Sequence, residues 1–98
     1  MAESAGGMSV RARIVVSGRV QGVGYRAFVV RVGTRHGLSG GVRNRDDGRV
    51  EVDVEGARTA IEALLRDLKV GPPGAHVTGV EAEWTPATGR FSGLSIWY

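Results

Sequence analysis

The sequence contains no cysteine, and Lys69 is its only lysine. The absence of cysteine excludes disulfides, thiolate nucleophiles and thiolate metal sites, and it is typical of a reducing compartment. No apolar run approaches the roughly 20 residues that a membrane-spanning helix needs. The first nine residues carry neither a basic stretch nor an apolar stretch, unlike a signal peptide. We therefore expect a cytoplasmic protein without a membrane partner, with a disordered tail over residues 1–8.

The rest of the composition is that of one ordinary globular domain, which we place at residues 9–98. Hydrophobic residues make up 42% of the 98 residues and charged residues 23%. The formal net charge is +3, and almost all of the positive charge comes from arginine. Because arginine forms directional bonds to phosphate and carboxylate, this bias indicates an anionic partner. Composition alone leaves a phosphorylated metabolite, a nucleic acid and a lipid surface as alternatives.

The spacing of apolar residues predicts strands and helices in a definite order. Alternation predicts strands over residues 10–16, 38–44, 49–55 and 78–84 and a short one over 94–98, and helical spacing predicts helices over 25–36 and 57–69. The order is βαββαβ plus a short final strand, that is, two split βαβ units. Such units form a ferredoxin-like α/β sandwich, an α+β fold whose two helices cover one face of an antiparallel or mixed sheet.

This topology predicts where a site would lie. A right-handed crossover returns the strand 38–44 parallel to the strand 10–16, so that the carboxyl ends of both lie at the same edge of the sheet. The first strand ends in the glycine-rich segment 17–24, and the second carries Asn44 at its end. We therefore expect the loop, the start of the first helix and Asn44 to form one cluster.

The glycine-rich segment is a candidate anion site. A glycine loop that enters a helix offers unpaired backbone amides and the positive end of the helix dipole. The Arg26 guanidinium, in the first helical turn, can bind two phosphate oxygens at once. The candidate loop residues are Arg19, Val20, Gln21, Gly22, Val23, Gly24 and Tyr25. The segment is neither a Walker A loop nor a dinucleotide fingerprint, and its glycine spacing alone is a weak signal.

Two longer motifs carry a family resemblance. The run Gly18-Arg-Val-Gln-Gly-Val-Gly-Tyr-Arg26 resembles the first signature of acylphosphatases. The run Leu38-Ser-Gly-Gly-Val-Arg-Asn44, continuing through Asp47-Gly-Arg-Val-Glu51, resembles the second. Residues 71–74, Val77 and 91–93 are similar to the C-terminal half of the family. The resemblance covers about residues 9–98 in register.

The resemblance implies an enzyme that hydrolyses an acyl phosphate, a small-molecule substrate, to a carboxylate and inorganic phosphate. It implies that the loop amides and Arg26 hold the phosphoryl group, that Asn44 orients the attacking water, and that no metal and no cofactor take part. Inorganic phosphate or sulfate should occupy the same loop. One departure is Gly41, because the family usually has a large aromatic residue there. We expect its loss to loosen the second strand.

Simpler structural roles compete with the functional roles of these residues. Arg26 could be a solvated arginine on an amphipathic helix, and Asn44 could only start the turn at Asp46-Asp47-Gly48. His36 is expected to cap the first helix, and Trp84 and Trp97 are expected in the core.

Two other functions also compete. One is an RNA-binding module of the same topology, which the acidic and aromatic-free strand 49–55 argues against. The other is a non-catalytic module that binds acyl or carbamoyl phosphate, as occurs at the start of larger carbamoyl-transfer proteins. Because nothing follows Tyr98, we expect a free-standing enzyme. No apolar stripe demands a partner, so we expect a monomer that binds no nucleic acid.

Overall fold

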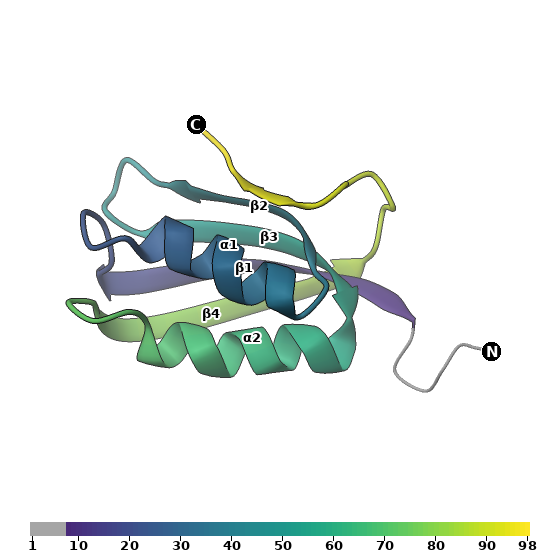
Figure 1. Ribbon diagram of the computed structural model, residues 1–98, viewed down its shortest axis with the longest axis horizontal. Coiled ribbons are helices and arrows are strands. Elements are labelled where there is room, and N and C mark those ends of the chain that lie inside the picture. The colour runs from purple at the N-terminus through teal and green to yellow at the C-terminus, as the bar shows by residue number, and fades with distance from the viewer. Residues whose placement is uncertain (1–7) are drawn as a thin grey trace.

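The computed structural model describes residues 8–98, so the predicted tail lies outside the described residues except for Met8. The elements are β1 (Ser9–Arg19), α1 (Tyr25–Arg35), β2 (Ser39–Asn44), β3 (Val50–Ala57), α2 (Arg58–Val70), β4 (His76–Pro86) and β5 (Leu94–Ile96). They form one sheet in the order β4-β1-β3-β2-β5, with both helices on one face (Figure 1). In the described part of the chain, neither helix is long and apolar enough to cross a bilayer.

The two split βαβ units interleave around the central strand β3. Strand β3 is antiparallel to both β1 and β2, so β1 and β2 run parallel on either side of it. Strand β5 adds to the sheet parallel to β2. The β1–α1 loop and the β2–β3 turn therefore lie at the same end of the molecule, on the left in Figure 1. This is the juxtaposition that the predicted topology requires.

The hydrophobic core lies between the sheet and the helices. Its residues are Ala12, Ile14, Val16, Val20, Tyr25, Val29, Val32, Leu38, Val42, Val50, Val52, Val54, Ile61, Leu64 and Leu68. Alternate positions of β1 and β3 supply one side, and the predicted stripes of the helices supply the other. Full burial of each valine, leucine or isoleucine side chain contributes about 1.5–3 kcal/mol, so this core fixes the helices on the sheet.

The predicted end of the first strand was wrong by three residues. Strand β1 continues to Arg19, and Gly18 and Arg19 pair with Val77 and His76 of β4 after a register shift at Ser17. Gly18 has a φ of +121°, and a Cβ there would collide with the His76 carbonyl. Glycine is thus what lets the strand continue beside β4, and the connecting loop shrinks to residues 20–24.

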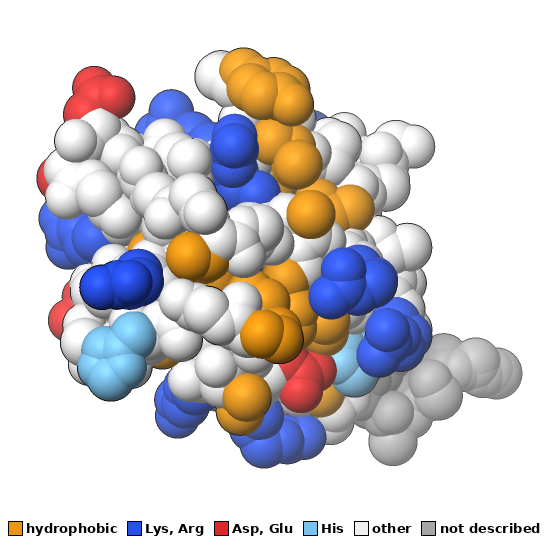
Figure 2. Space-filling view, turned by 60° about the vertical axis from the view of Figure 1, so that its left-hand side comes forward, with side chains coloured by type: hydrophobic (Ala, Val, Ile, Leu, Met, Phe, Trp, Pro, Cys, Tyr) orange, Lys and Arg blue, Asp and Glu red, His pale blue; other side chains and the backbone are white. Residues whose placement is uncertain are grey.

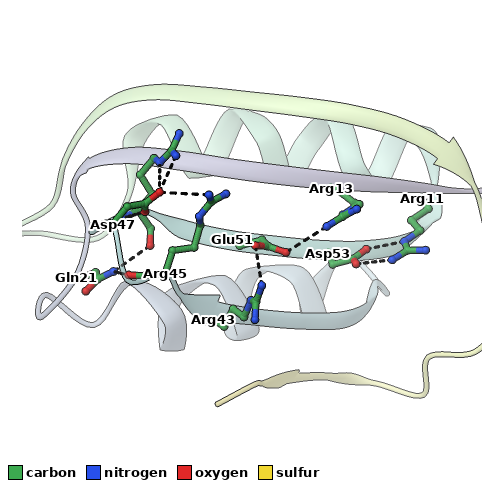
Figure 3. A network of polar contacts seen from close by, with 9 residues as sticks. Arg11, Arg13, Gln21, Arg43, Arg45, Asp47, Glu51 and Asp53 are labelled. Atoms are coloured by element: carbon green, nitrogen blue, oxygen red, sulfur yellow. Dashed lines mark hydrogen bonds and ion pairs between the residues drawn. The ribbon is translucent and has the colours of Figure 1, made fainter.

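Ion pairs cover the helix-free face of the sheet (Figure 3). Arg11 donates two hydrogen bonds to Asp53, at 2.8 and 2.6 Å. Glu51 lies 3.7 Å from Arg13 and 3.2 Å from Arg43. RNA-binding domains of this topology present on this face aromatic side chains that stack on RNA bases. Because β1 and β3 present paired charges there instead, the face does not favour the nucleic-acid alternative.

Trp97 lies on the helix-free face, so the expectation that it belongs to the core was wrong. A Cβ added at Gly41 would collide with the Trp97 indole, and Gly41 is buried beneath it. The Trp97 amide donates a hydrogen bond of 2.8 Å to the Val42 carbonyl, and its ring packs 5.6 Å from the Phe91 ring between centroids. The indole thus fills the space above Gly41. It packs against β2 where the sequence analysis expected a loosened strand.

Glu55 fixes the β4–β5 connection to the sheet and is only 5% exposed. Its carboxylate accepts hydrogen bonds from the Thr88 amide (2.8 Å), the Thr88 hydroxyl (2.6 Å) and the Gly89 amide (2.9 Å). Burial raises the pKa of Glu55, but these hydrogen bonds and the nearby Arg11 charge outweigh burial and hold it below its ordinary value. A carboxylate with a lowered folded-state pKa stabilises the fold above its unfolded-state pKa of about 4.3, and this contribution is lost as the pH falls through the folded-state value.

We expect Glu55→Gln to lower the free energy of unfolding by about 2 kcal/mol near neutral pH, because hydrogen bonds to a charged acceptor are lost. The variant should also lose less stability than the wild type on acidification. Urea unfolding at about pH 7 and about pH 3 measures both effects. The exposed Glu83→Gln on the edge strand β4 is the control. Equal acid sensitivity of Glu55→Gln and the wild type would contradict this interpretation.

Candidate active site

The loop over residues 20–24 presents unpaired backbone amides at the start of α1. Gly22 and Gly24 both have a φ of +77°, and no atom of the described residues lies within 4 Å of a Cβ built at either, apart from chain neighbours. Glycine is therefore required there by the backbone conformation and not by lack of space. Gly24 is the N-cap of α1 and provides no side-chain cap, and the first turn contains no acidic residue. The first amides of α1 are thus open donors at the positive end of the helix dipole.

These amides border a cavity of about 160 Å³. Its lining residues are Val20, Gly22, Gly24, Tyr25, Arg26, Ala27, Asn44 and Ile96. The cavity therefore joins the loop, the start of α1, the end of β2 and β5, and it brings Arg26 and Asn44 together. Of the other predicted loop residues, Arg19 ends β1, while Gln21 and Val23 do not line the cavity. Figure 2 turns this end of the molecule forward and shows basic side chains predominating over acidic ones.

Arg26 differs from the arginines of the helix-free face in its partners. Arg11, Arg13, Arg43, Arg45 and Arg49 each pair with a carboxylate. Among residues 8–98 no carboxylate pairs with Arg26, whose guanidinium lies 5.9 Å from the centroid of the Tyr98 ring. Its donors are therefore available to an anion in the cavity.

Asn44 contributes an acceptor. It is the last residue of β2, and its Oδ1 atom is buried with no hydrogen-bond partner within the described part of the chain. A buried amide oxygen without a donor costs about 1–3 kcal/mol. Asn44 lines the cavity, so the structure keeps beside it a polar atom whose capacity to accept a hydrogen bond is unused.

The Gln21 side chain holds the loop against the β2–β3 turn, a role that the sequence analysis missed (Figure 3). Its Nε2 donates to the Arg45 carbonyl at 2.8 Å and to the Arg49 carbonyl at 3.0 Å. Arg45 directly follows Asn44, so this bridge fixes the loop relative to Asn44. A long-range side-chain bridge of this kind has no local sequence signal beyond the place of Gln21 inside the motif.

Tyr25 fixes the other side of the loop. Its hydroxyl donates a 2.7 Å hydrogen bond to the Leu68 carbonyl near the end of α2, and burial raises the pKa of this phenol. The side chain is therefore part of the core and ties the start of α1 to the end of α2.

Gln21→Ala should lower kcat for acyl phosphate hydrolysis by about 10-fold, because losing the bridge lets the loop and Asn44 shift relative to each other. Steady-state kinetics with benzoyl phosphate measure this effect. Gln21→Glu, which keeps the length but cannot donate to two carbonyls, should be at least as impaired. A kcat equal to that of the wild type in both variants would show that the bridge does not position the site.

A family model described as acylphosphatase matches residues 12–96. The chain belongs to the acylphosphatase family. An acylphosphatase of Anaeromyxobacter dehalogenans is 54% identical over 87 residues, which cover 89% of this chain and 94% of the relative. The crystal structure of acylphosphatase from Bacillus subtilis superposes with a TM-score of 0.88 at 39% identity, covering 91% of this chain and 99% of that one. The predicted family, ferredoxin-like fold and enzyme class are thereby confirmed, and the substrate class of an acylphosphatase is a small-molecule acyl phosphate.

An acylphosphatase-like region also occurs within a longer protein. The crystal structure of HypF from T. kodakarensis matches with a TM-score of 0.77 at 38% identity. The match covers 89% of this chain but only 12% of HypF. The acylphosphatase fold is therefore found both as a protein of this size and as a small part of a larger one.

Proposed function

We propose that this chain hydrolyses the carboxyl–phosphate bond of acyl phosphates, with Arg26 and the loop amides binding the phosphoryl group and Asn44 orienting the attacking water. The observation that carries this proposal is the shared cavity of Arg26, Asn44 and the open amides of α1. Phosphoryl transfer mainly needs positioning and stabilisation of charge on the equatorial oxygens. The amides and the guanidinium supply that stabilisation, with no acidic residue in the first turn of α1 to oppose it.

The water is activated by position. The unpartnered Oδ1 of Asn44 accepts a hydrogen bond from the water and holds its oxygen in line with the bond that breaks. The water oxygen bonds to phosphorus, the bond from phosphorus to the acyl oxygen breaks, and its electron pair leaves on the carboxylate. That leaving group is stable as an anion and needs no general acid.

The proton of the water passes to a phosphate oxygen of the substrate. Supporting this step, the cavity lining within residues 8–98 includes no histidine, aspartate or glutamate, and the Tyr25 hydroxyl already donates a hydrogen bond to the Leu68 carbonyl. The rate should therefore show no pH limb from an enzyme histidine. His36 is bonded at 3.3 Å to Asp67, away from the cavity, in keeping with its expected place at the end of α1.

We further propose that the protein acts as a monomer in the cytoplasm, without metal, nucleic acid or membrane. Inorganic phosphate and sulfate should compete with the substrate for the loop amides. Light scattering after size-exclusion chromatography tests the monomer, and inhibition by phosphate tests the competition.

The deciding experiment is hydrolysis of benzoyl phosphate by the purified protein, followed by its absorbance change, with and without a chelator. We expect turnover that the chelator leaves unchanged. The similarity to one part of HypF favours a second candidate, a non-catalytic module that binds an acyl or carbamoyl phosphate. Binding of phosphate without turnover of benzoyl phosphate would support that candidate and overturn the proposed reaction.

A further inference from the structure

The cavity is smaller than the sites that usually enclose a drug-sized molecule. Its volume is about 160 Å³. Sites that bury a complete small molecule usually measure about 300–1,000 Å³. If the amides and Arg26 bind the phosphoryl group, as the proposed function requires, an aromatic or long acyl group extends toward the cavity mouth. The surface at the cavity mouth then decides which acyl groups are accepted.

An exposed aromatic ring lies at that mouth. Ile96, the last residue of β5, lines the cavity, and Tyr98 follows it two residues later, beyond the end of the strand. The Tyr98 ring lies 5.9 Å from the Arg26 guanidinium, yet Tyr98 is fully exposed. Figure 2 shows hydrophobic side chains beside basic ones near the end marked C in Figure 1. Tyr98 therefore adds nothing to the core and presents a free apolar face beside the phosphate-binding group.

Trp97, directly before Tyr98, is anchored to the sheet. Its indole occupies the space above Gly41 and contacts Phe91, and its amide pairs with Val42. Because successive side chains of an extended segment point to opposite faces, docking Trp97 on the helix-free face directs Tyr98 toward the Arg26 side. The glycine at position 41 makes this docking possible, since any side chain there would collide with the indole.

We propose that Tyr98 is a specificity-determining residue for the hydrolysis of acyl phosphates. Its ring forms the wall against which an aromatic or long apolar acyl group lies while Arg26 and the amides hold the phosphoryl group. The inference rests on the proposed function. Stacking and burial of an aromatic acyl group on one ring would favour it about 5- to 10-fold over an acetyl group, which is too small to reach the ring.

The test compares kcat/KM for benzoyl phosphate and acetyl phosphate in the wild type, Tyr98→Ala and Tyr98→Phe. We expect Tyr98→Ala to lose about 5- to 10-fold on benzoyl phosphate, mainly through KM, and less than about 2-fold on acetyl phosphate. Tyr98→Phe should keep the wild-type ratio, because the ring and not the hydroxyl forms the wall. The control is Met8→Ala, which removes another exposed hydrophobic residue, just before β1 and outside the cavity lining.

Trp97→Ala should shift the substrate ratio in the same direction as Tyr98→Ala, since it releases the ring. An equal loss on both substrates in Tyr98→Ala, or no loss on either, would overturn the inference. Neither result would touch the proposed function, because that is tested by turnover of benzoyl phosphate by the wild type.

Discussion

Arg26→Ala should lower kcat/KM for benzoyl phosphate by about 100-fold or more, the usual effect of removing one preorganised group that stabilises charge in a transition state. The guanidinium lines the cavity, and among residues 8–98 it has no carboxylate partner. Its removal therefore takes donors away from the phosphoryl group and leaves no acidic side chain unpaired. The free energy of unfolding should change little, by about 0.5 kcal/mol at most.

Arg26→Lys and Arg31→Ala make this prediction specific. Lysine keeps the charge but not the paired donors of the guanidinium, so Arg26→Lys should recover only part of the lost rate. Arg31 lies on the same helix, is exposed and does not line the cavity, so Arg31→Ala should retain the wild-type rate. Full activity in Arg26→Ala, or equal losses in Arg26→Ala and Arg31→Ala, would refute the assignment of phosphate binding to Arg26.

The proximity of Arg26 and Asn44 was predictable because it follows from connectivity. Alternating valines identify β3, helical spacing identifies α1, and a split βαβ unit then forces the ends of β1 and β2 to one edge of the sheet. Each step uses a local pattern and one general rule of chain handedness. The motif resemblance added the chemistry, which the glycine spacing alone could not supply.

Other parts of the site depend on contacts between distant residues and left no local pattern. Gly18 looks like a loop glycine, but pairing with β4 keeps it in a strand. The sequence analysis uses Gln21 only for its backbone amide in the loop, but its side chain donates hydrogen bonds to the carbonyls of Arg45 and Arg49. At position 41 the sequence has glycine where the family usually has an aromatic residue. The indole of Trp97, more than fifty residues later, fills the space that this leaves. In all three cases a residue far along the chain decides the role of a local one.

Asn44→Ala should lower kcat by about 100-fold while KM changes by less than about 3-fold, because the amide orients the water and does not hold the phosphoryl group. Its effect on stability should be small or favourable. The Oδ1 atom is buried without a partner, so deleting it relieves a cost of about 1 kcal/mol and offsets the lost packing. Kinetics with benzoyl phosphate and urea unfolding of the same preparation measure both effects.

This separation of rate from stability distinguishes the proposed role of Asn44 from that of a turn-starting side chain. If Asn44 only stabilised the turn that begins at Arg45, Asn44→Ala would lower the free energy of unfolding and leave kcat of the folded protein nearly unchanged. Asn44→Asp is a further variant for the same test. Its carboxylate would repel the phosphoryl group, so this variant should have a higher KM as well as a lower kcat. A functional site keeps an atom that the fold alone would not retain, and Asn44→Ala tests whether Oδ1 is such an atom.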